Sequence, residues 1–298
     1  MTVIWIVWGV GMALLMLAAL GLLATIPLMR RRVPDPADHP SLYGMLCEDA
    51  FFTSRDGLEL GGWWIPAEAP RGTVILVAGQ NGSLDKDLPQ AVPLHAAGFN
   101  VLMFDWRAHG RSEGEMVTLG AQEQADLLGA LDYVQQRGIM QAGVLGFSMG
   151  AGVALLVAAY DPRVQALVVD GAFPHMIGLL RGWGRQRGLP GPLASGLAWI
   201  VLLAGSLRSG YQLYRANPID LAARITAPVL FVHGERDPFV STPEVEALAA
   251  QVQGPVEVWR VPTAGHRQAF GQDPETYNRR VVGWFEQHLA AEPRPDAP

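Results

Sequence analysis

The residues of this sequence best suited to nucleophilic chemistry begin with a serine set between two glycines. Ser148 is the central residue of GFSMG, residues 146–150, which fits the pattern G-x-S-x-G. An apolar segment, residues 142–147, precedes it, and a run of small and apolar residues, 149–159, follows it. The pattern needs this setting because the serine must sit on a sharp strand-to-helix turn, where flanking side chains would collide with backbone. The sequence therefore predicts Ser148 as an exposed nucleophile.

Two later residues have the chemistry to activate that serine. Asp237 follows an apolar segment, residues 228–233, and His266 follows the last predicted strand. The carboxyl ends of parallel strands meet at one edge of a sheet, so we expect these side chains to lie close together. His266 would take the Ser148 proton as a general base, and Asp237 would hold the imidazole in the correct tautomer. Glu235 is the alternative acid, because it lies two residues nearer the strand.

The other reactive side chains form no second chemical pattern. The histidines are scattered and no H-E-x-x-H sequence occurs, so we predict neither a metal site nor a cofactor. The single cysteine, Cys47, cannot form an internal disulfide, which favours a reducing compartment. No histidine pattern accompanies Cys47, and we interpret it as a small apolar residue at the start of the first strand.

Several motifs in residues 51–289 resemble those of the α/β-hydrolase superfamily. Residues 104–112, FDWRAHGRS, are similar to the family's D-x-R-G-x-G-x-S turn, with Ala108 in place of the usual glycine. HGERDP at 233–238 is similar to the segment that carries the acid, and AGH at 264–266 to the segment that carries the base. The chain order of serine, aspartate and histidine is also the family's order. The resemblance is nearest to membrane-anchored bacterial members and to the monoacylglycerol-lipase-like and serine-aminopeptidase-like branches.

An acyl-transfer site also needs two backbone N–H groups that stabilise the oxyanion of the tetrahedral intermediate. Met149 directly follows the nucleophile and is expected to supply one of them. The resemblance implies that Gln80, in the loop at residues 79–82 after a strand at 73–78, supplies the other. Ala78 departs from the family pattern, which often has a histidine there.

Strand-like and helix-like segments alternate along the chain, which predicts a mostly parallel central sheet with helices on both faces. This α/β arrangement is the α/β-hydrolase fold that the resemblance implies. Strands are expected at residues 51–54, 58–65, 73–78, 100–105, 142–147, 164–170, 228–233 and 256–261, the first two as a hairpin. Helices are expected at residues 88–97, 121–136, 149–159 and 274–289.

The N-terminal segment has the composition of a membrane anchor. It carries no charged side chain from Thr2 to Met29, and about 20 apolar residues suffice for a helix to span a bilayer core. A cleavable signal peptide, the alternative, would have basic residues before a shorter apolar run. Here Arg30, Arg31 and Arg32 follow the run instead. Positive flanks stay in the cytoplasm, so we expect a single-pass protein of the cell membrane with a cytoplasmic catalytic domain.

These features divide the chain into an anchor, a linker, a core in two parts and an inserted cap. The linker is rich in proline and polar residues and is not expected to hold a regular element. The expected units are the transmembrane anchor 1–29, the linker 30–47, the first core part 48–171, the cap insert 172–216, the second core part 217–291 and a disordered tail 292–298.

The cap insert is basic and apolar. Its arginines are Arg181, Arg185, Arg187, Arg208 and Arg215, with no acidic residue among them. A second membrane span through the uncharged run at 188–207 would separate the serine from its partners, and the prolines near its start would break the helix. We therefore favour a cap that lies against anionic lipid headgroups. The alternative is an ordinary cap whose apolar face lines the pocket.

Two classes of function remain after these steps. The formal net charge of −6 gives no basis for nucleic-acid binding, which needs a basic surface. The first class is a serine hydrolase for a carboxylic ester or thioester of acyl or lipid type, acting at the membrane on a small-molecule or lipid substrate. Its main rival is an aminopeptidase-like serine peptidase or amidase, although a free amine would favour an acid in the cap. The second class is a catalytically silent binding protein on the same fold.

Overall fold

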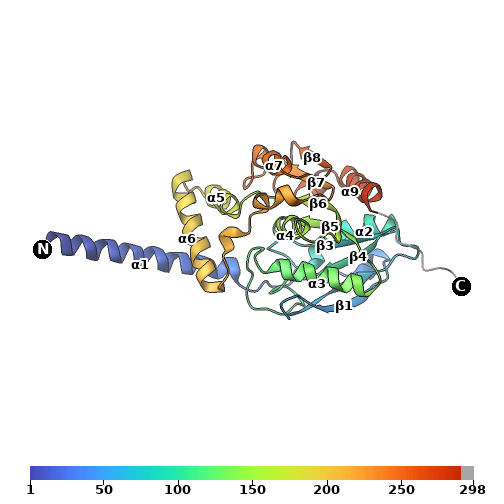
Figure 1. Cartoon of the computed structure of the whole chain (residues 1–298), viewed down its shortest axis with the longest axis horizontal. Coiled ribbons are helices and arrows are strands. Elements are labelled where there is room, and N and C mark those ends of the chain that lie inside the picture. Colours follow the sequence, from blue (N-terminus) through green and yellow to red (C-terminus); the bar gives the residue numbers. More distant parts are fainter. Residues whose placement is uncertain (290–298) are drawn as a thin grey trace.

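The computed structural model describes residues 1–289, apart from the side chains at positions 2, 3, 6, 7, 10, 13 and 14. The predicted tail at 292–298 lies outside the described residues. Within them the chain forms one eight-stranded sheet in the order β1-β2-β4-β3-β5-β6-β7-β8, flanked by helices (Figure 1). The first pair, β1 and β2, is an antiparallel hairpin, β2 pairs antiparallel with β4, and the remaining pairs are parallel.

Each strand expected from the sequence is present, which confirms the predicted fold class. The strands are β1 Glu48–Thr53, β2 Glu59–Ile65, β3 Thr73–Val77, β4 Asn100–Phe104, β5 Ala142–Phe147, β6 Val164–Asp170, β7 Val229–Gly234 and β8 Val256–Val261. The four strands β3, β4, β5 and β7 are buried along their whole length. Parallel strands covered on both faces read as continuous apolar runs, which is why these segments were recognisable.

The described residues form nine α-helices, four of which the sequence did not predict. They are α1 Thr2–Met29, α2 Leu88–Ala96, α3 Glu123–Gln136, α4 Met149–Ala158, α5 Met176–Gln186, α6 Gly191–Ser209, α7 Thr242–Ala249, α8 Ala269–Gln272 and α9 Pro274–His288. The unpredicted helices are α5, α6, α7 and α8, although α7 carries a sequence signal, a capping box between Ser241 and Glu244. The prolines expected to break a helix near residue 190 instead lie at the start of α6, where the missing N–H costs nothing.

Alternate residues of the central strands enter two separate cores. In β3, Ile75 and Val77 pack into a cluster with residues of α3 and α4. Val74 and Leu76 point to the other face and pack with residues of α2 and α9. This alternation follows from the pleat of a strand. The parallel strands β3, β5, β6 and β7 all end at the carboxyl-terminal edge of the sheet, between these two cores.

Helix α1 extends from the body as a rod and joins it only near its C-terminal end (Figure 1). The large apolar side chains described between Ile4 and Leu20 are exposed, whereas Thr25 and Met29 are buried. Gly21 is the crossing point with α6, because a Cβ there would lie 2.5 Å from Ile200 Cγ2. The last two turns of α1 are therefore packed into the protein, and the part before them is free.

Among the described residues, α6 is long and apolar enough to cross a membrane by length and composition. The segment Leu15–Met29 of α1 is apolar but shorter. Helix α6 packs against α1 and α5, and the chain returns from it to the core through short 3-10 turns. These contacts belong to the expected cap. The long segment at 171–219 is thus helical rather than structureless.

The start of the predicted linker has a fixed conformation. Arg30 forms an isolated β-bridge with Met116, and the backbone N–H of Arg32 donates to the carbonyl oxygen of Ala108 at 2.8 Å. Further along, Pro40–Tyr43 form a 3-10 helix. The chain therefore docks on the core directly after α1.

A buried ion pair braces the turn after β4. The Arg107 side chain is 3% exposed and bonds Asp126, whose side chain is fully buried, at 2.6 Å. Burial raises the pKa of Asp126 to about 7. Arg107 also bonds the partly exposed Asp56 at 2.7 Å. Two carboxylates thus neutralise the guanidinium. Removing one of them leaves the buried positive charge of Arg107 only partly compensated.

We expect Asp126→Asn to lower the free energy of unfolding by about 3 kcal/mol, because it breaks a buried charge pair. Urea denaturation followed by circular dichroism measures this. The matched control is Glu286→Gln, because Glu286 pairs with the exposed Arg71, and its cost should stay below about 1 kcal/mol. Equal losses in the two variants would contradict the assignment.

Candidate active site

Ser148 sits on the sharp turn that the sequence predicted, between β5 and α4. Its φ of 50° and ψ of −109° lie in a region that non-glycine residues rarely adopt and that stores strain. A Cβ on Gly146 would lie 2.7 Å from the carbonyl oxygen of Gly150, and one on Gly150 would lie 2.6 Å from that of Ala78. Neither position has room for a side chain. The two glycines of the motif are required by close backbone approach.

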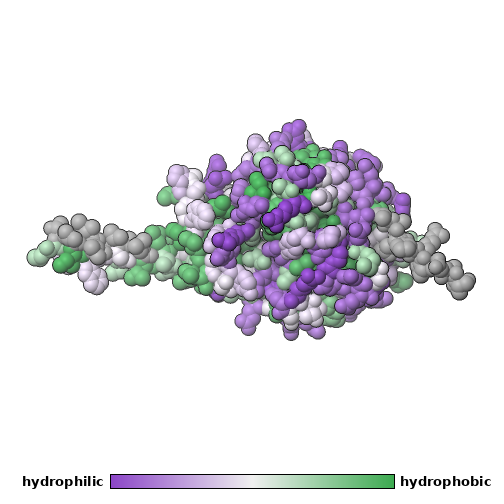
Figure 2. All heavy atoms as spheres, in the orientation of Figure 1, coloured by the Kyte–Doolittle hydropathy of each residue, from purple (hydrophilic) through white to green (hydrophobic). Residues whose placement is uncertain are grey.

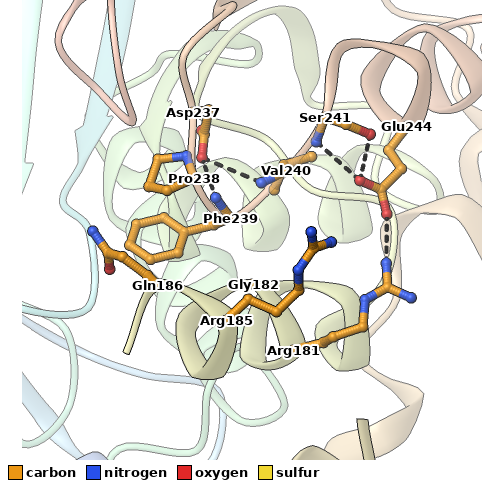
Figure 3. A pocket seen from close by; sticks show the side chains of 10 residues that line it. All are labelled: Arg181, Gly182, Arg185, Gln186, Asp237, Pro238, Phe239, Val240, Ser241 and Glu244. Atoms are coloured by element: carbon orange, nitrogen blue, oxygen red, sulfur yellow. Dashed lines mark hydrogen bonds and ion pairs between the residues drawn. The ribbon is translucent and has the colours of Figure 1, made fainter. Parts of the chain in front are cut away.

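The structure brings the three predicted catalytic side chains together. His266 Nε2 lies 2.8 Å from Ser148 Oγ, and His266 Nδ1 lies 2.6 Å from Asp237 Oδ2. The Asp237 side chain is 1% exposed. Its other oxygen accepts the backbone N–H groups of Phe239 and Val240 at 2.8 and 3.2 Å, as Figure 3 shows. The carboxylate is thereby fixed, and the imidazole proton on Nδ1 has a defined acceptor.

The alternative acids face other partners. Glu235 lies on the surface, with Oε1 3.9 Å from Arg260 Nε. Asp170, at the end of β6, is fully buried, and burial raises its pKa to about 6. It accepts the Tyr277 hydroxyl at 3.1 Å. Asp237 is the carboxylate that contacts His266.

The loop after β3 passes beside the nucleophile, where an oxyanion hole requires it. A Cβ on Gly79 would lie 3.5 Å from Ser148 Cβ, and Gln80 follows directly. Met149 is the first residue of α4. Within residues 1–289, neither the Gln80 nor the Met149 backbone N–H donates a hydrogen bond. Both groups are therefore free to bind a developing negative charge.

A second buried ion pair, which the sequence analysis missed, lies behind this loop. Arg267 Nη2 donates to Asp87 Oδ1 at 2.5 Å, and the guanidinium carbon lies 4.4 Å from the centre of the Phe147 ring. A Cβ on Gly79 would meet Arg267 Nη1 at 2.9 Å. Burial raises the pKa of Asp87, and Arg267 opposes that shift. The pair connects the residue after His266 to the start of α2.

Above Ser148 and His266 is a cavity of about 690 Å³ with mainly apolar walls. Three helices form those walls, with side chains Ala24, Pro27 and Leu28 from α1, Leu179, Leu180 and Trp183 from α5, and Ala194, Leu197, Ala198 and Val201 from α6. Two of these helices, α5 and α6, lie in the segment that the sequence assigned to the cap insert. The contribution of α1 was not predicted, because the sequence assigned that helix to the membrane alone.

A smaller cavity of about 520 Å³ separates α5 from the loop after β7. Figure 3 shows Arg181 of α5 reaching Glu244 of α7 across it, at 3.1 Å. The expectation of cap arginines without acidic partners is wrong at this position, because the acid comes from outside the cap. Ser148 and His266 do not line this cavity, so the chemistry belongs to the larger one.

Cys47 lies away from this site, directly before β1. Its Sγ is 3.7 Å from His39 Nε2, a neighbour that the sequence analysis did not anticipate. Burial raises the pKa of the Cys47 thiol, which disfavours the nucleophilic thiolate. Among the described residues, no group of three or more His, Cys, Asp or Glu side chains is arranged to hold a metal ion.

Comparisons with known proteins agree with this fold. Residues 72–191 match the family model described as alpha/beta hydrolase fold. The chain is 27% identical to the uncharacterized protein YfhR of Salmonella typhi over 87% of this chain and 85% of that protein. It is similar to a solved esterase, Pf2001 of Pyrococcus furiosus, with 26% identity, a TM-score of 0.74 and coverage of 88% and 99% of the two chains. The chain therefore has the α/β-hydrolase fold and is similar to members of that superfamily.

We expect Asp237→Asn to lower kcat by about 10³-fold or more, because the amide favours the imidazole tautomer with the wrong nitrogen facing Ser148. Steady-state kinetics with a soluble activated ester measures this. The control is Glu235→Gln, which removes a nearby exposed carboxylate and should change kcat by less than about 3-fold, as expected for a surface group. A large effect of the control and a small effect at Asp237 would reverse the assignment of the acid.

Proposed function

We propose that this protein is a serine hydrolase that cleaves a carboxylic ester or thioester of an acyl chain. The observation that carries the proposal is the hydrogen-bonded series from Asp237 through His266 to Ser148, which opens into an apolar cavity. An apolar cavity with a few converging polar groups is the usual form of a small-molecule site. The similarity to an esterase supports the same reaction class.

The geometry suits an acyl-enzyme mechanism in two stages. Ser148 Oγ attacks the acyl carbon while His266 Nε2 takes its proton, and the N–H groups of Met149 and Gln80 stabilise the resulting oxyanion. His266 then gives that proton to the departing alcohol or thiol, leaving the acyl group on Ser148. In the second stage water attacks the acyl-enzyme, with His266 again as the base, and the carboxylic acid is released.

The charges that line the cavity favour an ester over the free-amine substrate of an aminopeptidase. Among the described lining residues, Asp87 is the only carboxylate, and it is already paired with Arg267. A substrate ammonium group would therefore meet Arg32, Lys86, Arg187 and Arg267 without a free acid. The alternative of a catalytically silent binding protein is disfavoured because Ser148, His266 and Asp237 are all in hydrogen-bonding positions.

We also propose that α1 anchors the protein in the cell membrane. The free part of α1 before Gly21 is about 20 residues long and so about 30 Å, close to the thickness of a bilayer core. Its apolar surface contrasts with the polar body (Figure 2). Trp183, Trp199 and Leu207 are exposed on the cap, near the end of α1 that joins the body. This placement supports contact of the cap with lipid.

We expect Ser148→Ala to abolish both ester hydrolysis and covalent labelling by a fluorophosphonate probe, because the probe reacts with an activated serine. Gel fluorescence and a hydrolysis assay measure the two effects. Ser195→Ala, in the cap helix α6, is the matched control and should keep both. Undiminished labelling of the Ser148 variant would disprove the proposed nucleophile.

The proposed orientation predicts a cytoplasmic C-terminus, since the positive residues follow the apolar run. A fluorescent protein fused after Pro298 should therefore be bright, and alkaline phosphatase fused there should be inactive. Neutralising Arg30 and adding lysines after Met1 should weaken this preference. Active phosphatase on the unmodified chain would place the catalytic domain outside the cytoplasm.

A further inference from the structure

Arg32 joins the end of α1 to the loop that carries the proposed oxyanion donor. Its guanidinium donates to the carbonyl oxygens of Pro27 and Leu28 at 2.9 and 2.6 Å. Both carbonyls lie in the last turn of α1, where they have no partner within the helix. Its Nε donates to the carbonyl oxygen of Gln80 at 3.2 Å. A single planar side chain therefore bonds two segments that lie 48 residues apart.

Gln80 is held to α1 by a second link as well. Its side-chain Nε2 donates to the Leu28 carbonyl oxygen at 2.8 Å, and its own carbonyl oxygen also faces His109 Nε2 at 2.8 Å. The carbonyl and side chain of Gln80 are thus restrained while its N–H stays unbonded beside Ser148. The carbonyl, the side chain and the N–H of Gln80 are all carried on or next to one Cα, so holding the first two restrains the third.

Partial burial of the charged Arg32 side chain costs free energy, and a residue that only flanked a membrane would not need to be buried. The side chain is half-buried, and burial followed by the nearby charge of Arg30 lowers its pKa. No carboxylate among the described residues lies in ion-pair range of it. Arginine flanking a bilayer normally keeps its charged end in water. Here the guanidinium instead donates hydrogen bonds to three carbonyl oxygens. This indicates that the contact serves to hold structure at the proposed active site.

We infer that Arg32 is a positioning residue that sets the oxyanion loop, Gly79–Asn81, against the end of α1, so that the N-terminal helix forms part of the active site. The inference rests on the proposed function, because it assumes that the Gln80 N–H binds the oxyanion. Ala24, Pro27 and Leu28 extend the same role by walling the substrate cavity. Loss of one oxyanion donor typically costs about 10²- to 10³-fold in kcat, and a displaced donor should cost part of that.

The chain offers a matched control in the neighbouring Arg31. Its guanidinium also bonds three backbone carbonyl oxygens, those of Gly110, Ser112 and Gly114, at 2.7 to 2.9 Å. Arg31 therefore docks the end of α1 with the same charge and the same number of bonds, but it does not touch Gln80. A difference between variants at the two positions isolates the effect on the oxyanion loop.

The experiment compares Arg32→Gln with Arg31→Gln in the full chain, purified in detergent, with a short soluble ester. Arg32→Gln should lower kcat about 10- to 100-fold, as a weakened oxyanion contact predicts, with KM changed by less than about 3-fold. Arg31→Gln should leave kcat within about 3-fold of the unaltered chain. Arg32→Lys should restore part of the loss, because its ammonium still reaches a carbonyl but lacks the fork.

A trifluoromethyl ketone supplies a readout that a purely structural role would not move. Its adduct with Ser148 carries an oxyanion, so its Ki should rise in Arg32→Gln by the same factor as kcat/KM falls. If Arg32→Gln does not fold, Gln80→Met cuts the link to Leu28 and should show the same paired change. Equal losses at Arg31 and Arg32, or an unchanged Ki in the variant that folds, would overturn the inference. Failure of the proposed function is distinct, because the unaltered chain would then show no activity that depends on Ser148.

Discussion

The proposed active site depends on the close approach of backbone at the turn that carries Ser148. The turn brings α4 back against β3 so tightly that a Cβ on Gly150 would lie 2.6 Å from the carbonyl oxygen of Ala78. That contact places the end of β3 and the loop after it beside the nucleophile. The positive φ of Ser148 is strained, and such strain persists only where the surrounding structure determines the conformation. The buried strands on either side provide that restraint.

Buried charges then fix the loops that leave the same edge of the sheet. The Arg107–Asp126 pair holds the turn after β4, and the Arg267–Asp87 pair joins the histidine loop to the start of α2. Such pairs contribute little net stability compared with apolar packing, yet they tolerate only one arrangement of their partners. In this protein the two ion pairs determine loop positions more than they add stability. They keep loops from distant parts of the chain within hydrogen-bonding distance of one another.

The proposed substrate cavity is lined by three separate helices, α1, α5 and α6. Helix α1 has a double environment, since its first part is exposed and apolar while its last turns pack against α6 and the oxyanion loop. In the proposed membrane setting, an acyl chain could leave the bilayer along α1 and reach Ser148 without crossing water. The anchor and the catalytic machinery would then act as one unit, which a tethered but independent domain would not.

The sequence alone determined the central strands, because short apolar runs bounded by turn residues and alternating with helical segments fit a covered parallel sheet. It predicted the position of Ser148 because the glycine pattern marks one sharp turn. It predicted Asp237 as the partner of the histidine but kept Glu235 as the alternative, since the sequence does not show in which direction two carboxylates two residues apart will point. It also missed Asp87, Arg267 and the role of Arg32. These were decided by tertiary structure, because Arg32 meets Gln80 across 48 residues and Arg267 meets Asp87 across 180. Local pattern carries no information about which distant loop a long side chain will reach.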